Sequence, residues 1–140
     1  SSPTMLFGTS SLRGCLEYKT VLDLGCGNNS YVDVEQGQFR TRDFEPWLCR
    51  ALHEVGCKVI GVDMVGLEGE KFVYHYANLA EPDCLKMIAD KSVDVANASS
   101  LFDSPHLLSR LGLDPNRVKD NLLVQLERVL KPEGVFLYSW

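Results

Sequence analysis

The chain has 140 residues, a hydrophobic content of 45% and a charged content of 24%, which are ordinary proportions for a globular domain. A formal net charge of −5 argues against a nucleic-acid-binding surface, because neutralising phosphates needs clustered Lys and Arg. No apolar run approaches the roughly 20 residues that a bilayer span requires. We therefore expect a single domain over 1–140 that contacts neither a membrane nor nucleic acid.

The five cysteines are odd in number, and no two of them form a Cys-x-x-Cys pair. Since no secretory segment is visible either, this pattern favours a reducing compartment, and we expect a cytoplasmic protein. The three histidines, His53, His75 and His106, are scattered along the chain. We therefore predict no metal site.

Short apolar strands alternate with helical segments along the chain. Residues 1–19 form a short N-terminal segment ahead of the first predicted strand, Thr20–Leu24. A polar tract over 28–43 follows, which we interpret as an insertion loop that is either a lid over a ligand or a mobile segment. The first helix is predicted over Phe44–Val55, with Asp43 as its N-cap.

The second half of the chain continues this alternation. Its predicted strands are Lys58–Val62, Phe72–Tyr76, Val93–Ala96 and Val135–Ser139. A helix is predicted over Pro82–Asp90. A longer one is predicted over Pro115–Leu130, where Asp114 is a suitable N-cap and the apolar residues keep helical spacing.

Strands that alternate with helices indicate a parallel sheet covered by helices on both faces. Right-handed crossovers then limit the topology to a doubly wound α/β fold with five strands. In such folds the ligand crevice lies beyond the carboxyl ends of the strands, where the strand order reverses. The loops after Leu24, Val62, Tyr76 and Ala96 should therefore surround one pocket.

The segment TVLDLGCGNN (20–29) is an apolar strand that runs into a glycine turn. Gly25 and Gly27 allow the backbone to approach a ligand closely, because neither has a Cβ. Asp23 stands two residues before the first glycine. Its carboxylate would repel a pyrophosphate and attract a cationic amino-acid group. S-adenosylmethionine has an ammonium, a sulfonium and no phosphate, so the pattern favours this cofactor. The alternative role for Asp23 is that of a turn cap.

Five segments, in this order, resemble the class I S-adenosylmethionine-dependent methyltransferase family. They are VLDLGCGNN (21–29), VIGVD (59–63), ANLAE (77–81), SVDVANASSLF (92–102) and LKPEGVFLYS (130–139). The resemblance covers about residues 20 to 139. It implies a Rossmann-like methyltransferase fold and an enzyme that transfers a methyl group from S-adenosylmethionine to an acceptor by in-line displacement.

The resemblance also implies which residues contact the methionine part of the cofactor. Asp23 would lie near its ammonium group, and the loop would pass beneath it. The loop residues are Gly25, Cys26, Gly27 and Asn28. We assign no chemistry to the Cys26 side chain, because a residue between two glycines presents mostly backbone to the ligand.

Five further positions carry expected roles in binding the cofactor. Asp63, at the end of the second strand, would accept hydrogen bonds from both ribose hydroxyls, because a carboxylate offers two oxygens. Met64 would lie on the adenine face or in the core. Asn78 and Leu79 would lie beside the adenine ring, although Asn78 also suits an ordinary loop position. Asn97 would line the methyl-transfer end or form a turn.

The chain departs from the family pattern in four places, one of which is Asn78, where the family has an acid near adenine. Asn29 replaces the usual third glycine of the loop, and the insertion over 28–43 delays the first helix. The antiparallel strands that the family usually adds after the fifth strand are not visible. We therefore expect either that the chain is part of a longer one, or that a partner or a second copy covers the apolar edge strand that contains Val135–Ser139.

We predict no catalytic side chain, because transfer from a sulfonium mainly requires that donor and acceptor be aligned. The acceptor, a small molecule or a protein, is not identified by the sequence. The segment Asn97-Ala-Ser-Ser100 lacks the Asn-Pro-Pro-Tyr pattern of enzymes that methylate base amines. Two other functions stay open. A nicotinamide-dependent oxidoreductase would also place an acid at Asp63, and a non-catalytic module could keep the fold and bind a partner or the cofactor.

Overall fold

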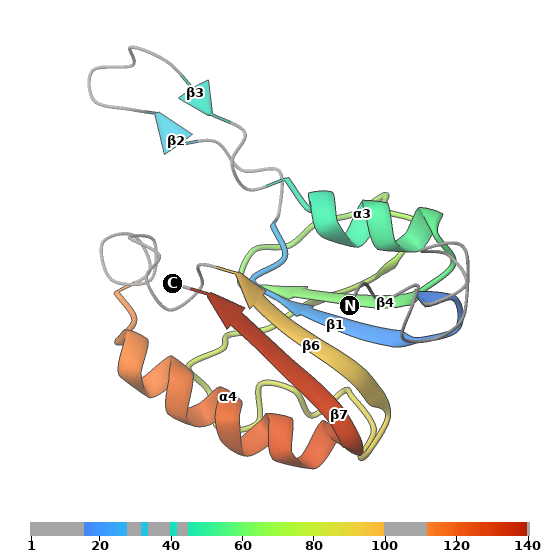
Figure 1. Cartoon of the computed structure of the whole chain (residues 1–140). Helices are drawn as coiled ribbons and strands as arrows, with labels where there is room; N and C mark the ends of the chain where they lie inside the picture. The colour runs from blue at the N-terminus through green and yellow to red at the C-terminus, as the bar shows by residue number, and fades with distance from the viewer. Residues whose placement is uncertain (1–15, 28–31, 34–39, 42–44, 100–111, 140) are drawn as a thin grey trace.

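The computed structural model describes residues 16–27, 32–33, 40–41, 45–99 and 112–139. Its main feature is a five-stranded sheet in the order β5-β4-β1-β6-β7, in which every neighbouring pair is parallel. The strands are β1 (Thr20–Leu24), β4 (Lys58–Asp63), β5 (Val73–Tyr76), β6 (Val93–Ser99) and β7 (Leu130–Ser139). Helices α3 (Trp47–Glu54) and α4 (Pro115–Val129) lie on opposite faces of this sheet (Figure 1). The predicted doubly wound α/β fold with five strands is confirmed.

The strand order places β1 at the centre of the sheet. The chain moves outward from β1 to β4 and β5, then returns to the other side of β1 with β6 and continues to β7. The point at which the order reverses therefore lies between β1 and β6. Asp23 of β1 and Asn97 of β6 are register partners there, so two predicted site residues lie at the expected crevice.

The larger hydrophobic core lies between the sheet and α4. The buried residues that α4 contributes to it are Val118, Leu122, Leu126 and Val129. As predicted, Asp114 caps this helix: its carboxylate accepts a hydrogen bond from the Asn116 amide at 3.0 Å, and Pro115 follows at the first helical position. The helix ends at Val129 because Leu130 has an extended backbone, with ψ of 138°.

A second, smaller core lies on the α3 side of the sheet. Its buried residues are Val21, Cys26, Cys49, Cys57, Val59 and Phe72. Cys49 is the buried residue of α3. The helix begins at Trp47 rather than at the predicted Phe44, because Pro46 disfavours the helical conformation of the residue before it. Pro46 is the N-cap and makes no side-chain capping bond; the predicted cap, Asp43, lies outside the described residues.

The prediction of a helix over Pro82–Asp90 is wrong, because this segment forms a series of turns. Three amides donate to the carbonyl three residues earlier: Cys84 to Glu81, Lys86 to Asp83 and Ile88 to Leu85. Arg128 of α4 donates to the carbonyl oxygens of Leu85 and Ile88 at 2.7 Å each. This long-range contact satisfies carbonyls that a helix would otherwise use, so tertiary structure overrides the local helical preference.

The last two strands are longer than predicted. β6 extends beyond Ala96 to Ser99: Asn97 pairs with both β1 and β7, and the ladder with β7 continues to Ser139. β7 starts at Leu130, which pairs with Val93 ahead of an irregularity in the register. Asn97 therefore lies within a strand rather than in the loop after it.

β7 forms one edge of the sheet, as expected. Three of its large apolar side chains are exposed: Val135, Leu137 and Tyr138. Exposed edge strands offer unpaired backbone groups to other chains. That a partner or a second copy covers this edge stays a prediction.

The insertion over 28–43 contains two short strands that the sequence did not predict. β2 (Val32–Asp33) and β3 (Arg40–Thr41) form an antiparallel pair. In Figure 1 the pair stands apart from the five-stranded sheet, on the side at which the strands of that sheet end. The rest of the insertion lies outside the described residues.

Gly61 of β4 lies where the structure has no room for a side chain. A Cβ there would lie 2.8 Å from Cys26 Sγ, 3.0 Å from Phe72 Cε2 and 3.1 Å from Cys49 Sγ. We expect Gly61→Ala to lower the free energy of unfolding by about 1–3 kcal/mol, the usual range for overpacking. Urea unfolding measures this. The matched control is Gly66→Ala, because a Cβ on Gly66 meets nothing within 4 Å; equal losses in both variants would contradict the prediction.

Candidate functional site

The glycine loop folds back from the end of β1 onto β4. Gly25 and Gly27 have positive φ angles of 68° and 108°, a conformation that L-residues with a Cβ adopt only with strain. The amides of Gly25 and Cys26 both donate to the carbonyl oxygen of Val62, at 2.8 and 3.2 Å. The loop is therefore held against the carboxyl end of the neighbouring strand.

Asp63, the last residue of β4, binds the same loop. Its Oδ2 accepts a hydrogen bond from the Gly27 amide at 2.8 Å, and its Oδ1 accepts one from the Met64 amide at 2.6 Å. Asp63 thus ties the loop to the end of β4 through both of its carboxylate oxygens.

The amides of three successive loop residues, from Gly25 to Gly27, thus donate to protein acceptors. Loops that bind phosphate or pyrophosphate instead direct several amide N–H groups at the ligand. The described part of this loop places a carboxylate where a phosphate-binding loop would have a donor. This arrangement disfavours a pyrophosphate at the turn.

Asp23 is a buried carboxyl group, 4% exposed, next to the loop. Its Oδ1 accepts a hydrogen bond from Asn97 Nδ2 at 3.0 Å, and its Oδ2 accepts one from Cys49 Sγ at 3.5 Å. Both donors are neutral. Burial raises the pKa of Asp23; the hydrogen bonds from Asn97 and Cys49 oppose this effect, and the charge of Asp63 adds to it.

Several of the predicted cofactor residues lie together at the carboxyl ends of β1, β4 and β6. They are Asp23, Gly25, Gly27, Asp63 and Asn97. Cys26 is part of the same loop, but its side chain is buried in the α3-side core. Asn28 lies outside the described residues.

The other predicted contacts lie along the segments that follow β4 and β5. Met64 is half-buried and packs against the α4-side core. Leu79 is fully buried in that core. Asn78 is exposed, and its Oδ1 accepts a hydrogen bond from the Ala80 amide at 3.0 Å. In this structure the side chain of Leu79 therefore serves packing, and that of Asn78 stabilises a turn.

Cys49 is a site residue that the sequence analysis missed. It lies on the buried side of α3, 26 residues after the carboxyl group to which it donates. The helical pattern marks it as a core residue. No local pattern pairs a cysteine on a helix with an acid on an earlier strand, because the contact depends on how the helix crosses the sheet.

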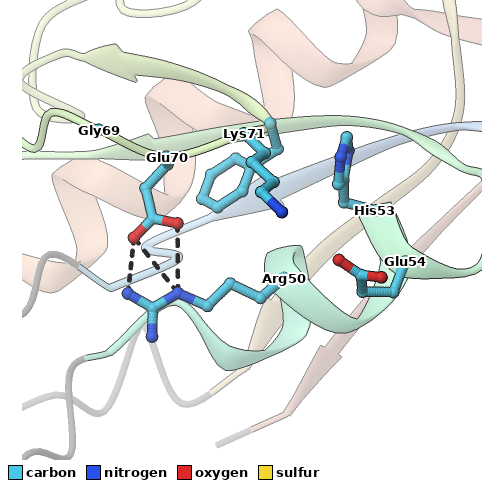
Figure 2. A pocket seen from close by; sticks show the side chains of 7 residues that line it. Arg50, His53, Glu54, Gly69, Glu70 and Lys71 are labelled. Atoms are coloured by element: carbon cyan, nitrogen blue, oxygen red, sulfur yellow. Dashed lines mark hydrogen bonds and ion pairs between the residues drawn. The ribbon is translucent and has the colours of Figure 1, made fainter.

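A cavity of about 270 Å³ lies elsewhere, between α3 and the segment that precedes β5. Its lining residues are Arg50, His53, Glu54, Gly69, Glu70, Lys71 and Phe72. Figure 2 shows Arg50 and Glu70 facing each other, joined by an ion pair of 2.6 Å. The lining contains acidic and basic groups and none of the predicted cofactor residues, so we do not assign the cofactor to this cavity.

Within the described residues, no group of three or more His, Cys, Asp or Glu side chains is arranged to hold a metal ion. No helix in the same part of the chain has the length and apolar character needed to cross a membrane.

No protein-family model matches the chain, and no curated protein matches it. Among solved structures, the chain is similar to a short chain dehydrogenase from Leptospira borgpetersenii serovar Hardjo-bovis with bound NAD+. The TM-score is 0.48 at 13% sequence identity, and the match covers 88% of this chain and 51% of that one. The chain thus spans about half the length of that dehydrogenase, and a similarity of this size does not assign a cofactor.

The buried carboxyl group of Asp23 should make stability depend on pH. Its folded-state pKa lies above the ordinary value of 3.8. Its contribution to stability is therefore fully present below the unfolded pKa and is lost as pH rises through the folded pKa. We expect the native chain to lose stability relative to Asp23→Asn across that window. Urea unfolding of both proteins over a pH series measures this, and a difference that does not vary with pH would contradict it.

Proposed function

We propose that this domain binds S-adenosylmethionine and transfers its methyl group to an acceptor by in-line displacement. The observation that carries the proposal is the glycine loop between two carboxyl groups. Its described amides are paired with protein acceptors, and Asp23 and Asp63 flank it. Such a site suits a nucleoside that carries a positive charge better than one that carries phosphates.

Asp23 supports the cationic part of this assignment. The two donors that bind it within the described residues are neutral, and its burial favours the uncharged form. An ammonium group in contact with Asp23 would favour the ionised form, because an opposite charge nearby lowers the pKa of a carboxyl group. Ligand binding would thus place a positive charge beside the Asp23 carboxylate, where the described residues place two neutral donors.

Asp63 supports the nucleoside part. It ends the strand next to β1, and its two oxygens are fixed by the amides of Gly27 and Met64. Fixed acceptors bind a ribose diol at a lower entropic cost than mobile ones. Asp63 would accept hydrogen bonds from the two ribose hydroxyls.

The role of the protein in the reaction is to align the two reactants and exclude water. S-adenosylmethionine supplies an already activated methyl group when it is bound. Asp23 would hold the ammonium end and Asp63 the ribose end, which would fix the direction in which the methyl group points. Asn97 would keep the Asp23 carboxyl group oriented through its hydrogen bond of 3.0 Å.

Calorimetry with three ligands tests the proposal. We expect S-adenosylmethionine and its demethylated product, S-adenosylhomocysteine, to bind, and NAD+ not to bind at the same concentration. Binding of NAD+ in preference to both would overturn the proposal and favour an oxidoreductase. Methyl transfer to a panel of small-molecule and protein acceptors then distinguishes an enzyme from a module that only binds the cofactor.

A further inference from the structure

Two cysteine thiols meet beneath the glycine loop. Cys26 lies between the two loop glycines, and Cys49 comes from α3. A Cβ built on Gly61 would lie 2.8 Å from Cys26 Sγ and 3.1 Å from Cys49 Sγ. The two sulfur atoms therefore both lie against the same position of β4, which has no side chain.

Both thiols are also tied to the candidate cofactor site. Cys26 Sγ donates to the carbonyl oxygen of Gly27 at 3.4 Å. Cys49 Sγ donates to Asp23 Oδ2 at 3.5 Å. A covalent bond between the sulfur atoms would therefore act on the loop and on the buried carboxyl group together.

We propose that Cys26 and Cys49 form a reversible disulfide that weakens cofactor binding when the protein meets a hydroperoxide. The effect on the cofactor rests on the proposed function, whereas the covalent step does not. With hydrogen peroxide as oxidant, the two S–H bonds and the O–O bond break and one S–S bond forms. The thiols lose two electrons to the peroxide, which leaves as two molecules of water.

The structure indicates the order of the two steps. Cys26 is the more exposed of the pair, at 7% against 0% for Cys49, so it meets the oxidant first and becomes a sulfenic acid. Cys49 then attacks the Cys26 sulfur, loses its proton, and a water molecule leaves.

The bond requires the sulfur atoms to approach to about 2.05 Å. The flanking residues Gly25 and Gly27 allow the Cys26 backbone to adjust, because glycine adopts many conformations without steric cost.

Oxidation would change the site in two ways. Cys49 would lose the hydrogen that it donates to Asp23, which leaves Asn97 as the donor to that carboxyl group within the described residues. The loop would also be tied covalently to α3. The loss of a hydrogen bond to a charged group predicts a decrease of about tenfold or more in affinity for S-adenosylmethionine.

The test begins with the native chain, treated with hydrogen peroxide and with dithiothreitol in turn. Peptide mapping by mass spectrometry under non-reducing conditions should show Cys26 and Cys49 in one cross-linked peptide pair that dithiothreitol separates. Calorimetry on the same samples should show weaker S-adenosylmethionine binding after peroxide and recovery after reduction. Cys49→Ser should give no cross-linked peptide pair after peroxide, because it lacks one of the two sulfur atoms. Cys57→Ser, a buried thiol outside the pair, should respond as the native chain does.

The outcomes separate the two proposals. If no Cys26–Cys49 cross-link forms, the inference is overturned whatever the ligand is. If the cross-link forms and affinity stays the same, the regulatory role is overturned. If the reduced chain does not bind S-adenosylmethionine, the proposed function fails and the regulatory role fails with it, while the mass spectrum shows whether the covalent step itself occurs.

Discussion

Replacing Asp23 by Asn is expected to weaken S-adenosylmethionine binding by about 2 kcal/mol or more, which is about 30-fold in Kd. The side chain keeps its shape and can still accept from Asn97. The variant lacks the negative charge that the ammonium group of the ligand would meet in a buried site. Calorimetry on the native chain and the variant measures the change.

A second ligand makes this result specific. Methylthioadenosine keeps the adenine, the ribose and a thioether but lacks the amino-acid group, so Asp23→Asn should change its affinity much less. Asp120→Asn, on the exposed side of α4, removes a surface carboxylate and should change neither affinity. Equal losses for both ligands in Asp23→Asn would show that the variant damages the loop and would remove Asp23 from the ammonium contact.

Asp63→Ala is expected to weaken the binding of both ligands by about 1.5–3 kcal/mol, the range for hydrogen bonds to a charged group. S-adenosylmethionine and methylthioadenosine both carry the ribose hydroxyls from which Asp63 would accept hydrogen bonds. The variant also leaves the amides of Gly27 and Met64 without their acceptor. Calorimetry again measures the change, and circular dichroism confirms that the fold persists.

The comparison of the two variants is the stronger test. Asp23→Asn should discriminate between the ligands, whereas Asp63→Ala should not. Glu68→Ala, an exposed acid in the loop after β4, controls for the loss of one negative charge near the site. If Asp63→Ala binds methylthioadenosine as well as the native chain does, Asp63 is not the ribose acceptor.

The order of the elements and the position of the crevice could be read from the sequence, because they depend on local patterns. The apolar run before Gly25, the strand that ends at Asp63 and the cap at Asp114 each have a local signature, and each lies where it was expected. The switch point follows from these elements and from the handedness of crossovers.

The features that the sequence analysis missed depend on contacts between distant residues. Arg128 determines the turns over 81–91 by binding carbonyls some 40 residues away. Asn97 lies in β6 rather than in the predicted loop, because its pairing involves residues of β1 and β7 that are distant in sequence. The contact of Cys49 with Asp23 depends on the packing of α3 over β1. None of these has a signature within a short window of sequence.

Within the described residues the two cores differ in size, and this difference has a consequence for the ligand. α4 anchors its face of the sheet with four buried residues, whereas α3 contributes Cys49. Local opening costs least where few apolar contacts are lost, so the face that carries the glycine loop should loosen before the opposite face does. A ligand bound at the glycine loop would have to order the α3 side of the sheet. Part of its intrinsic binding free energy would offset the entropy lost in this ordering.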